Sequence, residues 1–518
     1  MTVRNRRTAA LPAALAAAAL TAPLLLAGAA QATAADGPSA GSARAARAEW
    51  LAGELTRRAG ADGALRSLSA LQRIADRNGG TRVAGSPGHR ESAEYVAEQA
   101  RRAGLAVSRQ EFDYEYAQTV AERLTVLGPA PEDLPVLAMT YSASTPDGGL
   151  TAPLAVVAPD ATTGCEDADY PAGAFTGKVA LIRRGGCSFA VKQATAAAAG
   201  AVGAIVWNTT DGDLNGTLGD PAVAAIPTGG ITRARGEALA ARAADGGVTV
   251  TLEIRTFHET RRTWNVLAET RGGDERDTVL VGAHLDSVQA GPGINDNGSG
   301  SAGILEVAKA LAGHRVQHKV RFAWWSAEEF GLVGSEKYVA ALSEAQRAQI
   351  RLYLNFDMIA SPNGARFVYD GDDSDRTGSG PGPAGSAELE RRITGYLDRR
   401  GLPHEGTDFT GRSDYGPFIE AGIPAGGVDT GAEGIKSEAQ AARYGGTAGV
   451  AYDPCYHQAC DTLANLDRRS LDISVDVIAD SVGTYAWDLS TLPARPAAAP
   501  TGRATAGSAP REGHGAER

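Results

Sequence analysis

The chain has few cysteines for its length and no block of basic residues. Four cysteines and 6% aromatic residues occur among 518 positions, and the formal net charge is -11. An acidic chain without a Lys/Arg cluster lacks the electrostatic footprint of a nucleic-acid-binding protein, so we expect no nucleic-acid partner. The length predicts two or three domains with a large apolar core.

Long apolar runs are also missing after the first segment. Residues 1–35 place three arginines before an Ala/Leu-rich run at residues 9–30 and then small residues. This layout is typical of a secretory signal peptide, whereas Pro12 and Pro23 argue against a permanent membrane anchor. We therefore predict a secreted, extracellular protein with no membrane segment in its mature form.

The cysteines agree with export, because an even count in a secreted chain favours disulfides. Four cysteines allow three connectivities, but closeness in sequence favours local pairing. Their spacing does not match the usual zinc-binding cysteine cluster. The predicted pairs are Cys165 with Cys187 and Cys455 with Cys460.

Apolar residues recur at helical spacing from Leu65, stop in the sequence NGGTRVAGSPGHR at residues 78–90, and resume from Ser92 to Ala103. Residues 107–112 then predict a strand. From Ser490 onward the composition collapses to small, proline and charged residues, which cannot bury enough surface to offset chain entropy. We expect that tail to be disordered or processed.

The most informative stretch is VLVGAHLDSVQAGPGINDNGSGSAGILE at residues 279–306. Its first half predicts a buried strand that ends at His284, and its second half places Asp296 in a Gly-rich loop before a helix from about Gly300. Glycine and asparagine tolerate the tight backbone that would bring Asp296 back beside His284. We therefore expect the His284 imidazole and the Asp296 carboxylate, both of which are metal-ligand groups, to face the same point.

Two further strands end in acidic residues. The strand at residues 320–325 precedes Glu328 and Glu329, and the strand at residues 352–356 precedes Asp357. Adjacent carboxylates repel each other unless a cation or a proton intervenes. In α/β folds such strand ends meet at one crevice, so we expect these groups close together. A disulfide between Cys455 and Cys460 would hold the residues between them in a rigid loop.

This combination resembles the secreted double-zinc aminopeptidases of the streptomycete type. The resemblance implies an α/β, three-layer zinc-exopeptidase fold with a mixed central sheet flanked by helices. It implies two zinc ions, and Asp286 as the carboxylate that orients a ligand histidine. The implied ligands are His284 and Asp357 for one zinc, Glu329 and His457 for the other, and Asp296 as the bridge.

The resemblance also implies catalytic roles. Glu328 would be the general base, Tyr456 would donate to the oxyanion, and Arg412 would help to fix a peptide or protein substrate with a free amino terminus. Family members favour large apolar amino-terminal residues, and Met358 fits an apolar wall. Asp429 stands where the family has an aromatic residue, which raises an Arg/Lys preference as a second hypothesis.

Residues 174–210 closely resemble a protease-associated (PA) domain, with strands at 179–182 and 204–207 around a helix at 189–199. The insert contains no cluster of metal-ligand residues, so we interpret it as a lid or substrate-path module, with a structural spacer as the alternative. The predicted segments are a signal peptide (1–35), an N-terminal peptidase part (36–129), the PA insert (130–254), the metal-binding peptidase part (255–490) and the tail (491–518).

A calcium site is a further expectation. Asp472 and Asp476 match family residues that bind calcium, with Asp62 the nearest candidate for their amino-terminal partner. Solvated helix carboxylates are the simpler interpretation of this pair.

Three alternative functions stay open on the sequence alone. A zinc carboxypeptidase or a glutaminyl cyclase could use the same scaffold, and an inactive secreted binding protein could use the PA insert. The presence of all the ligand candidates and of Glu328 argues against an inactive scaffold. We expect the protein to be a monomer.

Overall fold

The computed structural model describes residues 40–494, apart from residues 129, 130, 211, 246, 377 and 379. The predicted signal peptide lies outside the described residues, as do residues 495–518 of the predicted tail. Among the described helices, none has the length and apolar character needed to cross a membrane.

The peptidase part is built on a mixed sheet, as predicted. The neighbouring strands at residues 425–429, 350–356, 274–284 and 318–325 run parallel, whereas the strands at residues 249–269 and 106–127 add to one side in antiparallel pairing. The sheet order is β13 (Glu405–Thr407), β12 (Phe367–Tyr369), β14 (Ala425–Asp429), β11 (Ile350–Phe356), β9 (Asp274–His284), β10 (His318–Trp325), β8 (Thr249–Glu269) and β1 (Ala106–Leu127).

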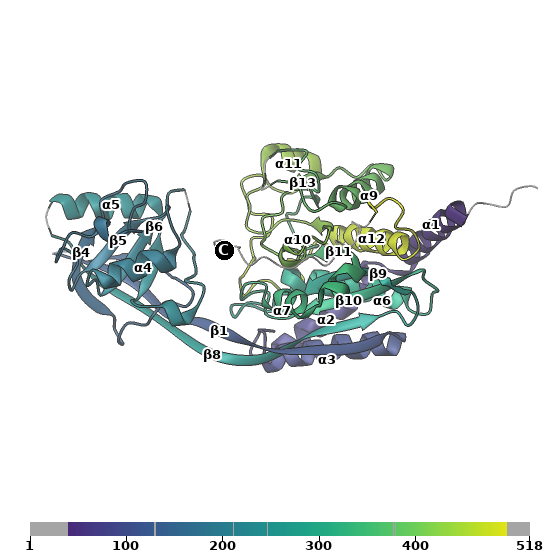
Figure 1. The fold of residues 1–518 in the computed structure, drawn as a ribbon, viewed down its shortest axis with the longest axis horizontal. Helices are drawn as coiled ribbons and strands as arrows, with labels where there is room; N and C mark the ends of the chain where they lie inside the picture. Colours follow the sequence, from purple (N-terminus) through teal and green to yellow (C-terminus); the bar gives the residue numbers. More distant parts are fainter. Residues whose placement is uncertain are drawn as a thin grey trace, which may run out of the picture. The chain divides into compact units, whose positions relative to one another are not determined.

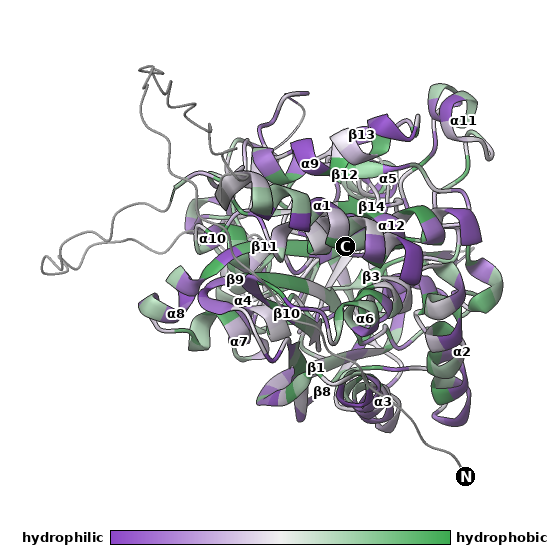
Figure 2. Cartoon of the chain, turned by 90° about the vertical axis from the view of Figure 1, so that its right-hand side faces the viewer, coloured by the Kyte–Doolittle hydropathy of each residue, from purple (hydrophilic) through white to green (hydrophobic). Residues whose placement is uncertain are grey.

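The central strands are apolar on both sides because helices cover both faces of the sheet. Val279 and Val281 of β9 join one apolar cluster, and Leu280 between them joins another. The adjacent Trp324 and Trp325 divide in the same way, and β9 is green over its apolar part in Figure 2. One cluster contains residues of α1 (Ala40–Arg58), α2 (Ala61–Arg77), α3 (Pro87–Ala103), α6 (Gly300–Leu311), α9 (Ser386–Arg399) and α12 (Arg468–Tyr485), and the other contains residues of α7 (Val333–Ala341) and α10 (Gly416–Glu420).

The insert has a parallel run of strands and apolar clusters of its own. The predicted strands and helix of this region are present, and Cys165 is bonded to Cys187. The elements are β3 (Leu137–Ala138), β4 (Leu150–Val156), β5 (Val179–Arg183), α4 (Phe189–Ala198), β6 (Gly203–Trp207), β7 (Thr228–Ile231) and α5 (Arg233–Asp245).

Strand β8 connects the strands of the peptidase part to those of the insert. Its first residues pair with β4 and its last residues pair with β10. Figure 1 shows β1 beside β8 along this whole length, and the two strands pair antiparallel from Ala106 with Glu269 to Leu127 with Thr249. The prediction of a strand at residues 107–112 was therefore too short, because a long two-stranded ribbon is exposed on much of its surface and carries little apolar alternation.

Helix α3 also begins earlier than predicted, at Pro87 instead of Ser92. Ser86 is the N-cap, its side chain accepts a hydrogen bond from the His89 N–H, and Pro87 occupies the first helical position. The apolar pattern does not predict this first turn, because the N-cap serine and the proline, and not core residues, determine where the helix begins.

A single methyl group at Gly427 should disrupt the sheet. Gly427 has φ 151°, and a Cβ atom there would lie 1.9 Å from the carbonyl oxygen of Asn355 on the paired strand β11. We expect Gly427→Ala to lower the free energy of unfolding by about 3 kcal/mol, measured by chemical denaturation. Gly272→Ala, where a Cβ would meet open space, is the matched control. Equal midpoints for the two variants would contradict this account.

Candidate metal centre

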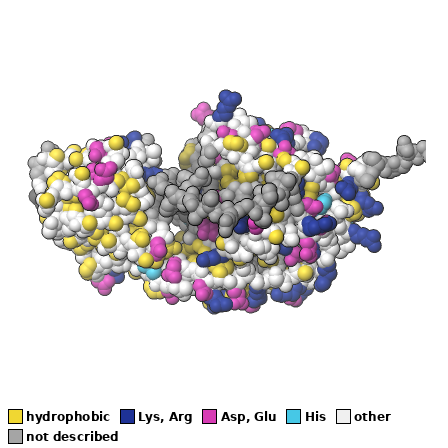
Figure 3. Space-filling view, in the orientation of Figure 1, with side chains coloured by type: hydrophobic (Ala, Val, Ile, Leu, Met, Phe, Trp, Pro, Cys, Tyr) yellow, Lys and Arg dark blue, Asp and Glu magenta, His cyan; other side chains and the backbone are white. Residues whose placement is uncertain are grey.

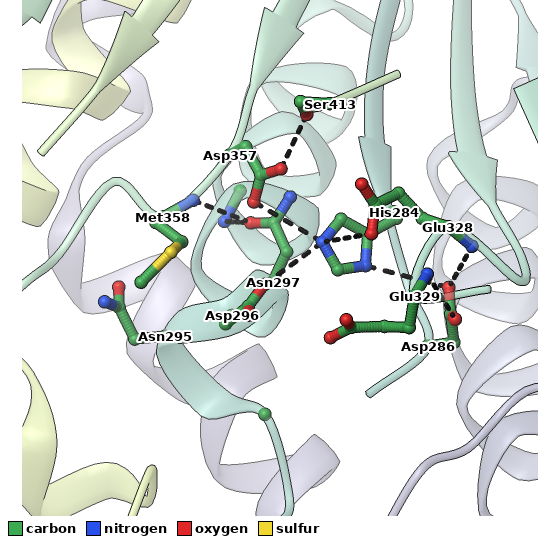
Figure 4. A network of polar contacts seen from close by, with 12 residues as sticks. His284, Asp286, Asn295, Asp296, Asn297, Glu328, Glu329, Asp357, Met358 and Ser413 are labelled. Carbon is green, nitrogen blue, oxygen red and sulfur yellow. Dashed lines mark hydrogen bonds and ion pairs between the residues drawn. The ribbon is translucent and has the colours of Figure 1, made fainter. Parts of the chain in front are cut away.

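The parallel strands deliver the predicted ligand residues to one edge of the sheet. Because β9, β10 and β11 are parallel neighbours, the residues that follow their carboxyl ends meet there, and Figure 4 shows several of them around His284. The six residues are His284 at the end of β9, Asp296 in the irregular turn η3 (Ile294–Ser299), Glu328 and Glu329 after β10, Asp357 after β11, and His457 between the bonded Cys455 and Cys460.

Asp296 lies between two groups of donors. Its Oδ1 is 3.1 Å from Nε2 of His284, which is also 3.4 Å from Oδ1 of Asp357. Its Oδ2 is 3.1 Å from Nε2 of His457, which is also 3.1 Å from Oε2 of Glu329. One carboxylate therefore contributes an oxygen to each of two groups that could hold a metal ion.

These distances suit zinc. Two ligands at about 2.0–2.1 Å from a tetrahedral zinc ion lie about 3.3 Å from each other, close to the separations found in both groups. Ser413 Oγ donates to Oδ2 of Asp357 at 2.6 Å, whereas Oδ1 of Asp357 is buried without a hydrogen bond and faces His284. Nitrogen and oxygen donors in this ratio fit a divalent cation of zinc type.

The nearby carboxylates shift the pKa values of the two histidines. Burial alone would lower the pKa of His284, but nearby carboxylates, led by Asp357, outweigh burial and raise it well above its usual value. Burial likewise opposes a rise at His457, whose pKa is raised to about 10 by Glu329 and Asp296. The pKa of Asp296 is lowered against burial by hydrogen bonds from both histidines. The site attracts positive charge, which a metal cation would supply in place of protons.

Asp286 positions His284 and the acidic pair Glu328 and Glu329. Its Oδ1 lies 3.7 Å from Nδ1 of His284, and its two oxygens accept the backbone N–H groups of Glu328 at 3.3 Å and Glu329 at 3.4 Å. The residue is completely buried. Asp286 therefore links the end of β9 to the acidic pair that follows β10.

Arg82 is a buried cation that no sequence pattern predicts. Its guanidinium donates to the backbone carbonyls of Leu285, Pro292 and Gly293 and so anchors the loop between β9 and η3. Burial lowers the pKa of Arg82 to about 10, while neighbouring carboxylates, led by Asp286, oppose that shift. The one sequence hint was a charged side chain within residues 78–90, the segment that interrupts the helical pattern.

Two further acidic residues missed in the sequence support the turn that carries Asp296. Asp461 accepts the backbone N–H groups of Asn295 at 2.8 Å and Asp296 at 3.0 Å, and Asp453 accepts the Asn295 side-chain amide at 2.7 Å. Burial raises the pKa of Asp461 to about 7. Both acids flank the Cys455–Cys460 loop, which was the only available hint of their role.

A cleft of about 340 Å³ opens onto these donors. Its lining includes all the residues predicted to contact substrate: Met358, Arg412, Asp429 and Tyr456. Arg412 pairs with Glu433 at 2.8 Å and lies 3.5 Å from the Tyr456 hydroxyl. The Tyr456 ring stacks on His457 with centroids 3.8 Å apart, so the two neighbours constrain each other.

The predicted calcium residues have protein partners. Asp476 pairs with Arg400 at 2.9 Å, and Asp62 pairs with Arg468 at 2.6 Å. Asp472 accepts the backbone N–H of Ala61 at 2.9 Å. Burial, together with Asp472, raises the pKa of Asp476 to about 6. Calcium binding here stays a prediction, and two arginines already balance part of the charge.

The fold and the donor groups define a metal-dependent hydrolase with an α/β core and an inserted module. Residues 265–482 match peptidase family M28, and residues 150–239 match the PA domain. Leucine aminopeptidase 2 of Trichophyton equinum is 46% identical over 416 residues, which cover 80% of this chain and 82% of that protein. The probable leucine aminopeptidase 2 of Aspergillus fumigatus is 46% identical over 418 residues, covering 80% and 81%.

Solved structures agree with these relatives. The aminopeptidase of Aneurinibacillus sp. strain AM-1 has a TM-score of 0.67 at 30% identity, covering 83% of this chain and 95% of that one. A zinc aminopeptidase of Bacillus subtilis has a TM-score of 0.60 at 27% identity, covering 81% and 94%. The chain belongs to peptidase family M28 and is a metalloaminopeptidase with a PA domain. This family membership confirms the prediction of an enzyme over the alternative of an inactive binding protein.

Zinc should stabilise the fold through Asp296. We expect added zinc to raise the thermal midpoint of the metal-free protein, with a gain of about 2.7 kcal/mol when free zinc is 100 times its Kd. Asp296→Asn, which keeps the side-chain size but removes the charge, should abolish most of this gain in differential scanning calorimetry. Asp147→Asn, at a side chain that is 91% exposed, is the control. An undiminished zinc response in Asp296→Asn would contradict the assignment.

Proposed function

We propose that the chain is a secreted aminopeptidase that uses two zinc ions to hydrolyse the amino-terminal peptide bond of peptides and proteins. The observation that carries this proposal is the position of Asp296, with each carboxylate oxygen 3.1 Å from a different histidine nitrogen. We assign one zinc to His284 and Asp357, the other to Glu329 and His457, and the bridge to Asp296. When bound, such a pair of ions polarises the scissile carbonyl and acidifies a water molecule.

Glu328 is the proposed general base. Its carboxylate is buried, its Oε2 lies 3.8 Å from Nε2 of His284, and Asp286 accepts its backbone N–H. From this position Glu328 can take a proton from the attacking water and return it to the departing amine. Glu328 and Asp357 also offer negative charge to the free α-ammonium of the substrate.

Tyr456 is the proposed hydrogen-bond donor to the tetrahedral oxyanion. Tyr456 lines the cleft, and stacking on His457 restricts its ring before substrate arrives. A donor that is fixed in advance lowers the barrier because it need not reorganise during the reaction. Arg412, held by Glu433, lies beside the same hydroxyl and is placed to fix the substrate.

The specificity we propose is for large side chains. The cleft wall contains Met358 and the aromatic residues Phe367, Tyr369, Tyr415 and Tyr452, which together provide apolar surface for a residue such as leucine. Asp429 also lines the cleft, and burial raises its pKa to about 7. Because its carboxylate ionises near neutral pH, we infer that Arg and Lys side chains are accepted as well when it is charged.

The remaining segments complete the proposal. The insert at 130–254 has its own apolar clusters and, in its described part, no group of residues that could hold a metal ion, so we assign it a lid or spacer role. Two disulfides support export, directed by a signal peptide at residues 1–35. We retain the monomer as a prediction. Leu492 is buried in the apolar core of the peptidase part, so the predicted start of the tail at residue 491 is too early, and the rest of the predicted tail lies outside the described residues.

Replacing the base should separate catalysis from metal binding. We expect Glu328→Gln to lower kcat on Leu-p-nitroanilide by about 10²–10⁴-fold while zinc content stays unchanged. Glu344→Gln, at an exposed position of α8 (Glu344–Gln349), is the matched control. Near-normal turnover, or zinc loss detected by metal analysis, would remove Glu328 from this role.

The preference between basic and apolar substrates should depend on pH. As pH rises through about 7, Asp429 becomes charged, and the ratio of kcat/KM for Arg- over Leu-p-nitroanilide should increase about tenfold, equivalent to about 1.4 kcal/mol. Taking a ratio cancels the pH dependence that both substrates share. Asp429→Asn should flatten the profile. The same rise in this variant would exclude Asp429 as the cause.

A further inference from the structure

A second cavity of the peptidase part has a different chemical character from the catalytic cleft. We call it the basic pocket, a cavity of about 380 Å³ lined by four cationic side chains, Arg366, Lys436, Arg443 and Arg469. Asp467 is the one acidic residue among the described residues that line it. On the face shown in Figure 3, by contrast, dark blue and magenta side chains are interspersed. With a net charge of -11 for the whole chain, this concentration of positive charge is a local feature.

The cations of the basic pocket are poorly neutralised by the protein. Among the ion pairs of the described residues, Arg443 pairs with Glu405 at 3.5 Å, but no pair involves Arg366, Lys436 or Arg469. Asp467 is engaged as the N-cap of α12, where it accepts the backbone N–H groups of Arg469 and Ser470. One carboxylate with this task cannot balance three unpaired cations.

Lys436 makes the imbalance costly, because its side chain is only 1% exposed. Its ammonium donates to the carbonyls of Gly364 at 2.8 Å and Gly445 at 2.9 Å, which uses two of its three hydrogens. Burial lowers the pKa of Lys436, and the positive charge of Arg366 lowers it further. Asp467 opposes this shift, but it is already engaged as an N-cap, so an external anion would still relieve the cost of the buried cation.

We propose that the basic pocket binds a small oxyanion of the phosphate type. The Nε–H of Arg366 is already bonded to the carbonyl of Pro403 at 2.7 Å, which leaves its two terminal nitrogens for a ligand. Guanidinium groups bind tetrahedral oxyanions through paired hydrogen bonds, and a lysine adds a point charge. Arg366, Arg469 and Lys436 combine both kinds of donor around one cavity.

Such an anion would bear on the catalytic cleft through the segment at residues 432–452. Lys436 lies in this segment, and its backbone N–H donates to Val450 at 3.0 Å. Nearer the cleft, Tyr452 N–H donates to Gly434 at 2.9 Å, and both of these residues line the cleft. Fixing Lys436 in the basic pocket would therefore also fix one wall of the proposed substrate site. Anion binding itself does not depend on the proposed function.

Calorimetric titration tests the site directly. Zinc-loaded full-length protein would be titrated with sodium phosphate and with sodium acetate at constant ionic strength. The variants are Arg469→Gln, at an exposed side chain, and Arg366→Gln, with Arg347→Gln on exposed α8 as the control. We expect phosphate affinity to fall at least tenfold in both pocket variants and to be unchanged in the control. Phosphate bound at the metal centre would be common to all four proteins.

Equal phosphate affinity in the wild type and both pocket variants would overturn the proposal. Acetate binding as tightly as phosphate would overturn the assignment to a phosphate-type ligand.

The sign of a stability change provides an independent test. Without phosphate and at low salt, Arg469→Gln should melt no lower than the wild type, because it relieves repulsion and removes a cation from the amino-terminal turn of α12. Phosphate should then raise the wild-type midpoint by about 2 °C or more and leave this variant nearly unchanged. A variant that melts lower without phosphate would show that Arg469 stabilises the fold unaided, and would overturn the proposal.

Discussion

Mutual repulsion among carboxylates is the constraint on which the rest of the structure depends. Asp286, Asp296, Glu328, Glu329 and Asp357 all crowd around His284 and His457 at one edge of the sheet. Such an arrangement is unstable unless positive charge is present and the backbone is held firmly. The parallel strands supply the rigid frame, and a bound cation would supply the charge.

Much of the surrounding structure maintains this crowding. Arg82 ties down the loop after β9 through three carbonyls, Asp286 ties the acidic pair to the same strand, and Asp461 fixes the turn around Asp296. These contacts are made to backbone groups, so they fix the main-chain positions from which the ligand side chains extend. A fixed main chain keeps the donor atoms within a few tenths of an ångström of the geometry that a metal requires.

The sequence predicted the parts of the site that follow from local pattern. Apolar runs closed by turn residues located β9, β10 and β11, and the residues just beyond them proved to lie together. Arg82 and Asp461 could not be found in this way, because their partners lie more than 160 residues away in the chain. The β1–β8 ribbon and the basic pocket were missed for a related reason. The middle of β1, from Ala117 to Arg123, has no buried residue that would continue the apolar alternation, and a pocket formed by three loops and a helix end has no sequence signature.

The bond between Cys455 and Cys460 closes a ring around only four residues, two of which are Tyr456 and His457. Thiols stay reduced in the cytosol, whereas disulfides form and persist in oxidising compartments, so this ring closes where conditions are oxidising. A reduced pair would leave the loop that carries His457 without this covalent restraint. Closing the ring thus limits how far His457 can move from Asp296 and Glu329, its neighbours in the candidate metal centre.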